Sequence, residues 1–311
     1  MPTITQPIAN IFKAAHIPAN ELSIAASTSG LIITHSTTGK QYFTKTDRNV
    51  PEMRGEVASL VAMSKTSTGL VPELLGFEVS PDGKEGTMVT QWFDLSSARG
   101  GHTQRGLGSK IAQMHMPPPE GTEGYEGKYG FPVPTHCGAT EQDNTWEESW
   151  EVFWRDRRLG NLVNRIGDKE INALWEDMKR KAVPLLLHSF SPAPQPVILH
   201  GDLWSGNAGY DETTSSPVIF DPASYYGHNE ADLGITHMFG GFSYEFYDEY
   251  HQVHPRSSPY YDERQKLYEL YHHLNHTYMF GGSYKHGAMG IMRSLIAWAE
   301  REGQEEAVEE C

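Results

Sequence analysis

The sequence predicts an α+β protein with two lobes: a small N-terminal lobe built on an antiparallel sheet with one helix, and a larger, mainly helical C-terminal lobe. Short runs of β-branched and aromatic residues occupy about the first ninety positions, whereas amphipathic helical patterns dominate after Phe93. A length of 311 residues allows two domains at most. We therefore expect residues 1–92 to form the N-terminal lobe and residues 93–311 the C-terminal lobe.

Composition narrows the classes of partner. The chain has 25 Lys and Arg residues against 40 Asp and Glu residues, a formal net charge of −15. A negative surface repels phosphate backbones and anionic lipids, so we expect neither nucleic acid nor a membrane as a partner. The same charge suits an amine-bearing substrate, although solubility alone also explains it.

The sequence also indicates a compartment. It has no apolar run of transmembrane length, and its first residues lack a basic segment followed by an apolar one. The two cysteines, Cys137 and Cys311, are too few for a disulfide framework. We expect a cytoplasmic protein.

The N-terminal lobe is expected to contain four strands and a helix. The strands are at 31–34, 41–45, 70–79 and 85–93, and the helix is at 55–63. The turn-forming segments 36–39 and 81–83 join the strands in pairs. The helix is expected to bury a face made of Val57, Ala58, Leu60 and Val61.

Helices are expected at 106–116, 146–166 and 171–187, and over most of residues 232–298. The aromatic residues Trp146, Trp150, Phe153 and Trp154 share one helical face, which is typical of core packing. Residues 117–143, rich in Gly and Pro, are too long for a simple connection and are expected to be functional or disordered.

Residues 196–234 carry the side chains with the clearest chemistry. The apolar run 197–199 leads to Asp202, Asn207 follows five positions later, and a second apolar run, 218–220, leads to Asp221. The polar stretch between the runs predicts a hairpin turn. Such a hairpin places Asn207 and Asp221 near each other at its open end.

This spacing fits phosphoryl transfer from ATP. The reaction needs Mg²⁺ held by hard oxygen ligands and a carboxylate that accepts a proton from the attacking hydroxyl or orients it. Asp202 and Asn207 have the interval of a kinase catalytic loop, and Asp221 stands where the second metal ligand belongs. We expect Asp202 to be the base, and Asn207 and Asp221 to bind Mg²⁺. The alternative is a set of loop-capping residues. We expect Asp232 to be structural, capping a helix or holding the catalytic loop.

The strings HGDLWSGN (200–207) and DPASYYGH (221–228) resemble the signature of the fructosamine-3-kinase or ketosamine-3-kinase family, which includes protein-ribulosamine 3-kinases and has a protein-kinase-like fold. Aminoglycoside- and choline-kinase relatives share the HGD and the Asn but not the intervening Leu-Trp-Ser-Gly. Further similar segments occur in the same order: GEVASL (55–60), QMHM (113–116), YGF (129–131), W-x3-W with RRL (146–159), MFGGF (238–242) and YHHLNH (271–276).

The resemblance implies an ATP site in the N-terminal lobe. Lys45 would grip the ATP phosphates and Glu56 would pair with it, whereas on sequence alone Lys45 is an ordinary strand-end charge. Backbone groups of the hinge segment, Thr90, Gln91 and Trp92, would hydrogen-bond adenine.

The phosphate loop, 26–31, departs from the family because it is poor in glycine. Gly30 is its one glycine, surrounded by Ser27, Thr28 and Ser29. Hydroxyl and amide groups could still cover the phosphates.

The resemblance also implies the reaction, that of a transferase acting in protein repair. The substrate would be a ketosamine, a fructosamine or ribulosamine adduct of free lysine or of a protein. Phosphorylation at the 3-hydroxyl makes the adduct labile, so the amine is deglycated. Trp204 would form a wall for the sugar or pack under its loop. His228 would lie near the substrate or make a hydrogen bond at a helix start.

Two other readings of the chemistry compete. One is a kinase of another small amine-bearing hydroxyl compound, such as an aminoglycoside or choline-like amine. The other is a kinase-fold binding protein without turnover, which the glycine-poor loop favours.

His272, His273 and His276 include a pair at helical spacing that could bind a metal. No carboxylate or cysteine nearby in the sequence completes a site, so we expect packing residues. Cys137 is expected to be an ordinary loop thiol with no base beside it.

Overall fold

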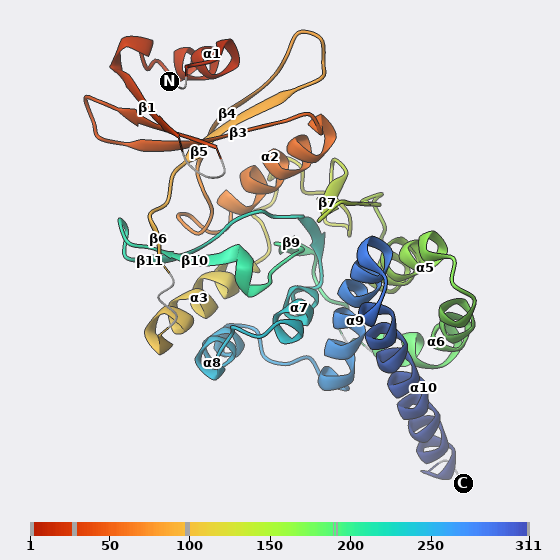
Figure 1. Ribbon diagram of the computed structural model, residues 1–311. Coiled ribbons are helices and arrows are strands. Elements are labelled where there is room, and N and C mark those ends of the chain that lie inside the picture. Colours follow the sequence, from red (N-terminus) through yellow and green to blue (C-terminus); the bar gives the residue numbers. More distant parts are fainter. Residues whose placement is uncertain (1–2, 27–29, 97–99, 189, 191, 310–311) are drawn as a thin grey trace.

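The computed structural model describes residues 3–309 except 27–29, 97–99, 189 and 191. Ser27, Thr28 and Ser29 of the expected phosphate loop therefore lie outside the described residues. A small lobe built on a sheet lies above a larger helical lobe (Figure 1). The predicted α+β architecture is confirmed.

The described part of the N-terminal lobe contains a five-stranded antiparallel sheet with the order β1-β2-β3-β5-β4. Its strands are β1 (Leu22–Ala26), β2 (Leu31–His35), β3 (Gln41–Asp47), β4 (Leu74–Val79) and β5 (Gly86–Gln91). Strand β1 was not predicted. The expected strand at 70–79 begins late, because Leu70 is buried and its carbonyl oxygen accepts a hydrogen bond from Ile219 of the other lobe instead.

In its described residues this lobe contains two α-helices rather than one. Helix α1 (Gln6–Ala14), absent from the prediction, packs Ile8, Ile11 and Phe12 into a small apolar cluster with the sheet. Helix α2 (Val50–Ser64) starts five residues before the predicted segment, where the Asn49 side chain caps it. The predicted buried face was partly wrong, since Val61 is 38% exposed.

The chain leaves the N-terminal sheet after Gln91 and joins a different one. Strand β6 (Leu95–Ser96) pairs with β10 (Ala208–Asp211), which in turn pairs with β11 (Ser216–Ile219). The backbone N–H of Asp94 donates to the carboxylate of Asp211, 2.9 Å away. These contacts fix the segment that follows the N-terminal sheet to the larger lobe.

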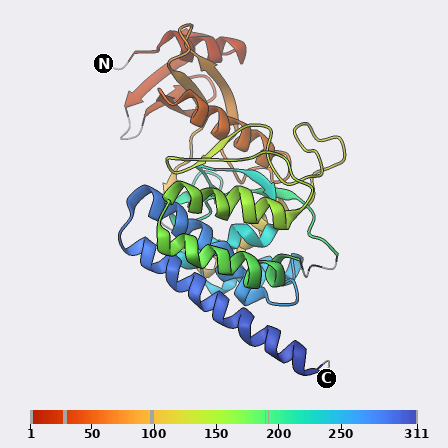
Figure 2. The same ribbon diagram turned by 90° about the vertical axis from the view of Figure 1, so that its right-hand side faces the viewer.

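The larger lobe is mainly helical. Its principal helices are α3 (Gly101–Met114), α5 (Asn161–Ile166), α6 (Lys169–Leu187), α7 (Gly234–Met238), α8 (Tyr244–Val253), α9 (Tyr261–Phe280) and α10 (Ser283–Glu309). The predicted helix at 146–166 is composite, with α4 (Trp150–Val152) running into the π-helix η2 (Phe153–Gly160). Helix α10 packs against α6 and α9 and then extends away from the lobe (Figure 2). Trp150, Phe153 and Trp154 are buried, as predicted for a core face, whereas Trp146 lies before the helix and is only partly buried.

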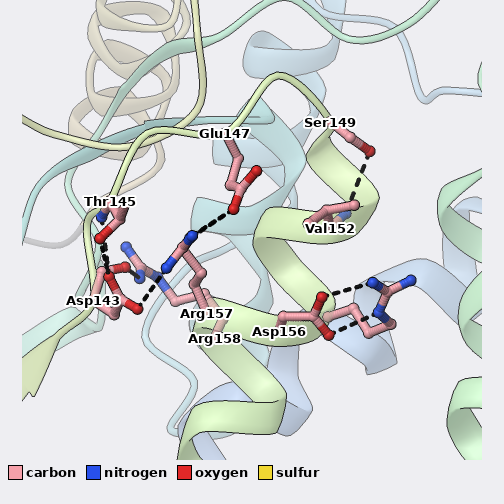
Figure 3. A network of polar contacts seen from close by, with 9 residues as sticks. Asp143, Thr145, Glu147, Ser149, Val152, Asp156, Arg157 and Arg158 are labelled. Carbon is pink, nitrogen blue, oxygen red and sulfur yellow. Dashed lines mark hydrogen bonds and ion pairs between the residues drawn. The ribbon is translucent and has the colours of Figure 1, made fainter.

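The long Gly- and Pro-rich segment is folded onto the helical lobe. It contains the short hairpin β7 (Thr135–Cys137) and β8 (Thr140–Gln142), followed by a network of polar contacts (Figure 3). Arg157 binds the carboxylates of Asp143 and Glu147, and Arg158 donates to the backbone oxygen of Asp143. The network ties the end of the hairpin to the π-helix.

Among the described residues, no helix combines the length and apolar character needed to cross a bilayer.

Candidate active site

The catalytic loop follows β9 (Val197–Leu199) and is held by Asp232. The Asp232 carboxylate accepts hydrogen bonds from the backbone N–H groups of His200 at 2.7 Å and Gly201 at 2.8 Å. The His115 ring lies 3.1 Å from the same carboxylate. Burial alone would raise the pKa of Asp232, but these hydrogen bonds outweigh it and the pKa is lowered. Asp232 therefore holds the catalytic loop, one of its two expected structural roles.

Gly201 is required by the turn into this loop. Its φ is +81°, and a Cβ there would lie 2.1 Å from the carbonyl oxygen of Ala223. The loop therefore approaches the segment after Asp221 too closely for any side chain.

The structure brings Asp202, Asn207 and Asp221 together. The Asn207 side-chain amide donates to the backbone oxygen of Asp202 at 2.9 Å and to its carboxylate at 3.3 Å. The backbone oxygen of Asn207 accepts a hydrogen bond from the backbone N–H of Phe220, which precedes Asp221. Asn207 and Asp221 therefore flank the open end of the β10–β11 hairpin. Asp221 has a φ of +55°, a conformation uncommon outside glycine and often found at functional sites.

The environment of Asp202 raises its pKa to about 7. Burial is the largest cause, and repulsion from Asp232 and Asp221 adds to it, while hydrogen bonds from Cys137 and Asn207 act in the opposite direction. A carboxyl group that titrates near neutral pH can accept a proton from a hydroxyl and release it again.

Across the cleft, Lys45 on β3 pairs with Glu56 on α2 at 2.7 Å. Burial would lower the pKa of Lys45, but the charge and hydrogen bond of Glu56, with a further contribution from Asp221, raise it. Lys45 is therefore held as a cation that faces the end of the β10–β11 hairpin.

A cleft of about 560 Å³ opens beside three of these groups, whereas Asp202 and Asn207 are not among the residues that line it. Lys45, Glu56 and Asp221 line it together with the hinge residues Thr90, Gln91 and Trp92. Its apolar lining includes Phe43, Leu60, Met88, Phe93 and Phe220. The cleft thus offers an apolar end at the hinge and a charged end at Lys45.

The hinge amides need one correction. The backbone N–H of Gln91 donates to Glu73 at 2.7 Å, and that of Trp92 donates to Gln41 at 3.2 Å. Both donors serve the sheet, so they are not free to bind a base, and an adenine at the hinge would need other groups of the segment.

Gly30 lies at the start of β2, outside the residues that line the cleft. A Cβ at Gly30 would lie 2.2 Å from the carbonyl oxygen of Thr44 on β3. A side chain at position 30 would therefore collide with the backbone of β3.

The two expected substrate residues differ in position. Trp204 is 38% exposed, packs edge-on against Phe239 and covers Gly206, so it both supports the loop and presents a free surface. His228 is buried, with Nδ1 bonded to the Tyr268 hydroxyl at 2.8 Å and the ring of Phe190 against it. Burial lowers the pKa of His228 to about 4. The ring of His228 is enclosed in the core and is not exposed to a substrate.

A cluster that the sequence did not reveal lies beside Asp202. The potential ligand atoms of Cys137, Asp202 and His272 all lie within 4.8 Å of one another, and the Cys137 thiol donates a hydrogen bond to the carboxylate. The sequence placed no base beside Cys137, but in the structure the Asp202 carboxylate lies next to its thiol. His272, expected to be a packing residue, is buried in the same cluster. The three residues are distant in sequence, so their spacing carries no signal.

The fold and this site define a phosphotransferase of the protein-kinase-like class: a Lys–Glu pair and Asp221 line a cleft, and Asp202 and Asn207 lie at the same hairpin end as Asp221. A family model described as fructosamine kinase matches residues 3–298. This chain belongs to the fructosamine kinase family.

Relatives with ketosamine kinase names support this family assignment. The chain is 36% identical over 263 residues to the ketosamine-3-kinase of Mus musculus, covering 78% of this chain and 82% of that protein. It is 36% identical over 269 residues to the chloroplastic protein-ribulosamine 3-kinase of Arabidopsis thaliana, covering 84% of this chain and 78% of that one. A crystal structure of a candidate fructosamine-3-kinase from Thermobifida fusca superposes with a TM-score of 0.76 at 21% identity, covering 95% and 100% of the two chains, and supports the fold alone.

Proposed function

We propose that this protein is an ATP- and Mg²⁺-dependent kinase that phosphorylates the 3-hydroxyl of ketosamines, the fructosamine or ribulosamine adducts of lysine or of proteins. The observation that carries the proposal is the position of Asp202. Its carboxyl group, with a pKa of about 7, is hydrogen-bonded to Asn207 beside a cleft that also holds Lys45 and Asp221, in a chain of the fructosamine kinase family.

The nucleotide would lie along the cleft. Its base would pack among the apolar residues at the hinge, and its phosphates would meet Lys45, which Glu56 keeps in place. We propose that the boundary at 92/93 separates this nucleotide-binding lobe from the catalytic lobe.

Asn207 and Asp221 fit the requirements of a magnesium site. Because the side-chain nitrogen of Asn207 donates to Asp202, the side-chain oxygen Oδ1 is the atom that would bind the ion. Asp221 supplies a carboxylate from the other side of the hairpin end. Both are hard oxygen donors of the kind Mg²⁺ prefers. When bound, Mg²⁺ would neutralise charge that develops on the transferring phosphoryl group.

Asp202 would accept the proton of the sugar 3-hydroxyl as that oxygen attacks the γ-phosphorus of ATP, while the bond from the γ-phosphorus to the β–γ bridging oxygen breaks and ADP leaves. Trp204 would lie against the sugar, since part of its surface is free at the catalytic loop. The phosphorylated adduct would then break down and release the amine, which completes deglycation. The occupied catalytic positions argue against a binding protein without turnover, and the Leu-Trp-Ser-Gly string argues against a kinase of other amines.

Compartment is a separate matter. A cytoplasmic location stays a prediction, and the Arabidopsis relative is described as chloroplastic.

The test is ATP consumption in the presence of Mg²⁺ with fructosyl-lysine and ribulosyl-lysine offered in parallel. Loss of a general base lowers rates by about 10²–10⁴-fold, so Asp202→Asn should fold but lose turnover by that factor. Asp177→Asn, which removes a partly exposed carboxylate on α6, is the matched control and should keep it. Unchanged turnover in Asp202→Asn would remove the proposed base, and no turnover of either adduct by the wild type would remove the proposed substrate class.

A further inference from the structure

The cluster beside the catalytic carboxylate contains three different kinds of metal-ligating group. Cys137 ends β7, Asp202 lies in the catalytic loop, and His272 lies in α9. Cys137 and His272 are 2% and 3% exposed. Within the described part of the chain, Nδ1 of His272 is buried and has no hydrogen-bond partner. An unpaired polar atom in the core has a cost in free energy, and this one belongs to a histidine that clusters with two other ligating groups.

The scaffold holds these groups in register without help from a ligand. On α9, the residues on either side of His272 in the helix bond to the β7–β8 hairpin. Asn275 donates to the Cys137 backbone oxygen at 3.0 Å, and the Tyr271 hydroxyl donates to Gln142 at 3.0 Å. Gln142 in turn donates to the backbone of Ala223 at 2.8 Å, which fixes the hairpin to the catalytic segment. Ligands held in this way need little rearrangement to bind an ion.

The protonation states also suit a metal. Burial lowers the pKa of His272 to about 3, with like-charge contributions from His276 and His273, so its imidazole is neutral and one ring nitrogen offers a lone pair without first losing a proton. Burial and the neighbouring Asp202 raise the pKa of the Cys137 thiol, so without a cation it keeps its proton. A divalent cation reverses this preference, because it displaces the proton from the sulfur.

We propose that Cys137, Asp202 and His272 form an inhibitory site for a thiophilic divalent cation of the Zn²⁺ class. One thiolate, one imidazole and one carboxylate form a donor set that suits zinc, whereas Mg²⁺ takes oxygen ligands and would bind at Asn207 and Asp221. Tetrahedral zinc places such ligand atoms about 3.3–3.6 Å apart, so the three side chains would close by about 1 Å from separations of up to 4.8 Å.

Binding of the cation forms a sulfur–metal bond, and the thiol proton passes to the buffer. Asp202 donates an electron pair to the same ion. A carboxylate engaged in this way cannot accept the proton of a sugar hydroxyl. The inhibition rests on the proposed role of Asp202. Raising the concentration of MgATP should not relieve it, because Cys137, Asp202 and His272 are not among the residues that line the nucleotide cleft.

Binding can be measured apart from turnover. Titration of metal-free protein with Co²⁺ should give the thiolate-to-cobalt charge-transfer absorption with one ion bound per chain, and calorimetry with Zn²⁺ in two buffers should show proton release. Cys137→Ser should abolish the absorption, and both Cys137→Ser and His272→Asn should weaken Zn²⁺ binding by at least about tenfold. The control is His273→Asn, which removes the adjacent imidazole on the same helix and should bind as the wild type does.

Turnover then tests inhibition. Each variant is compared with its own metal-free rate, and the Zn²⁺ concentration that halves that rate should rise at least about tenfold in His272→Asn but not in His273→Asn. Absence of Co²⁺ and Zn²⁺ binding in the wild type, or unchanged binding in Cys137→Ser and His272→Asn, would overturn the site. Stoichiometric binding without turnover of any ketosamine would support the site and count against the proposed function. Turnover that is insensitive to Zn²⁺ would support the proposed function and count against the inhibitory site.

Discussion

Replacing Cys137 with alanine should shift the pH dependence of catalysis toward alkaline pH. The thiol donates a hydrogen bond to Asp202, and this bond is the largest effect that lowers the pKa of the carboxyl group, acting against burial. Cys137→Ala removes the donor and leaves the ionised carboxylate less stable. The pKa of Asp202 should therefore rise from about 7.

The size of the shift follows from the strength of the bond. Hydrogen bonds to charged groups contribute about 1.5–3 kcal/mol, and a thiol is a weak donor. A loss of about 1.4 kcal/mol corresponds to about one pKa unit. The base would then be half ionised near pH 8, and the rate at neutral pH would fall several-fold.

The assay is kcat/KM for the ketosamine from about pH 5 to pH 10 at saturating MgATP, because this parameter reports the pKa of essential groups in the enzyme–MgATP complex, and the wild type and the variant are compared in the same complex. Cys137→Ser is the matched control: its hydroxyl can donate to the same carboxylate and should keep the acidic limb at or below the wild-type position. An acidic limb in Cys137→Ala that stays in place or moves to lower pH would refute the reasoning.

Three further changes test other parts of the account. Folding raises the pKa of Asp202 from 3.8 to about 7, so ionisation of this group destabilises the fold increasingly as pH rises through that window. Asp202→Asn should therefore unfold at a higher temperature than the wild type at pH 8 but not at pH 4. The difference in free energy of unfolding, measured by thermal denaturation, should reach up to about 4 kcal/mol. Gly30→Ala should raise KM for ATP and lower the melting temperature, since its Cβ would overlap the backbone of Thr44; an unchanged KM would separate this loop from nucleotide binding. Trp204→Ala should raise KM for the ketosamine about tenfold while leaving KM for ATP unchanged, and equal effects on both would point to a disordered loop instead.

Much of the fold could be predicted because its signals are local. Strands β2, β3 and β5 are short β-branched or aromatic runs next to turn residues, and these patterns do not depend on distant contacts. Helix α1 and strand β1 were missed because their sequences, QPIANIFKA and LSIAA, are short and are stabilised by packing on the rest of the lobe. The exposed position of Val61 likewise depends on how α2 lies between the two lobes.

The site residues also fall into two groups, those with a local signal in the sequence and those brought together only by tertiary packing. Asp202, Asn207 and Asp221 were found because Asn207 and Asp221 flank one hairpin and Asp202 lies five residues before Asn207, so their spacing is visible in the chain. The approach of Cys137 and His272 to Asp202 in the catalytic loop arises only when the long loop and α9 pack together, so sequence alone treated each as an isolated residue. The enclosure of His228 also comes from tertiary packing, which its motif does not reveal.

The most direct test of the central claim is to locate the transferred phosphate. Wild-type protein is incubated with MgATP and fructosyl-lysine or ribulosyl-lysine, and the products are analysed by phosphorus and proton NMR. The account predicts a phosphate ester at the 3-hydroxyl, followed by release of free lysine, with neither product formed by Asp202→Asn. Phosphate on another hydroxyl, or ATP hydrolysis that leaves the ketosamine unchanged, would contradict it.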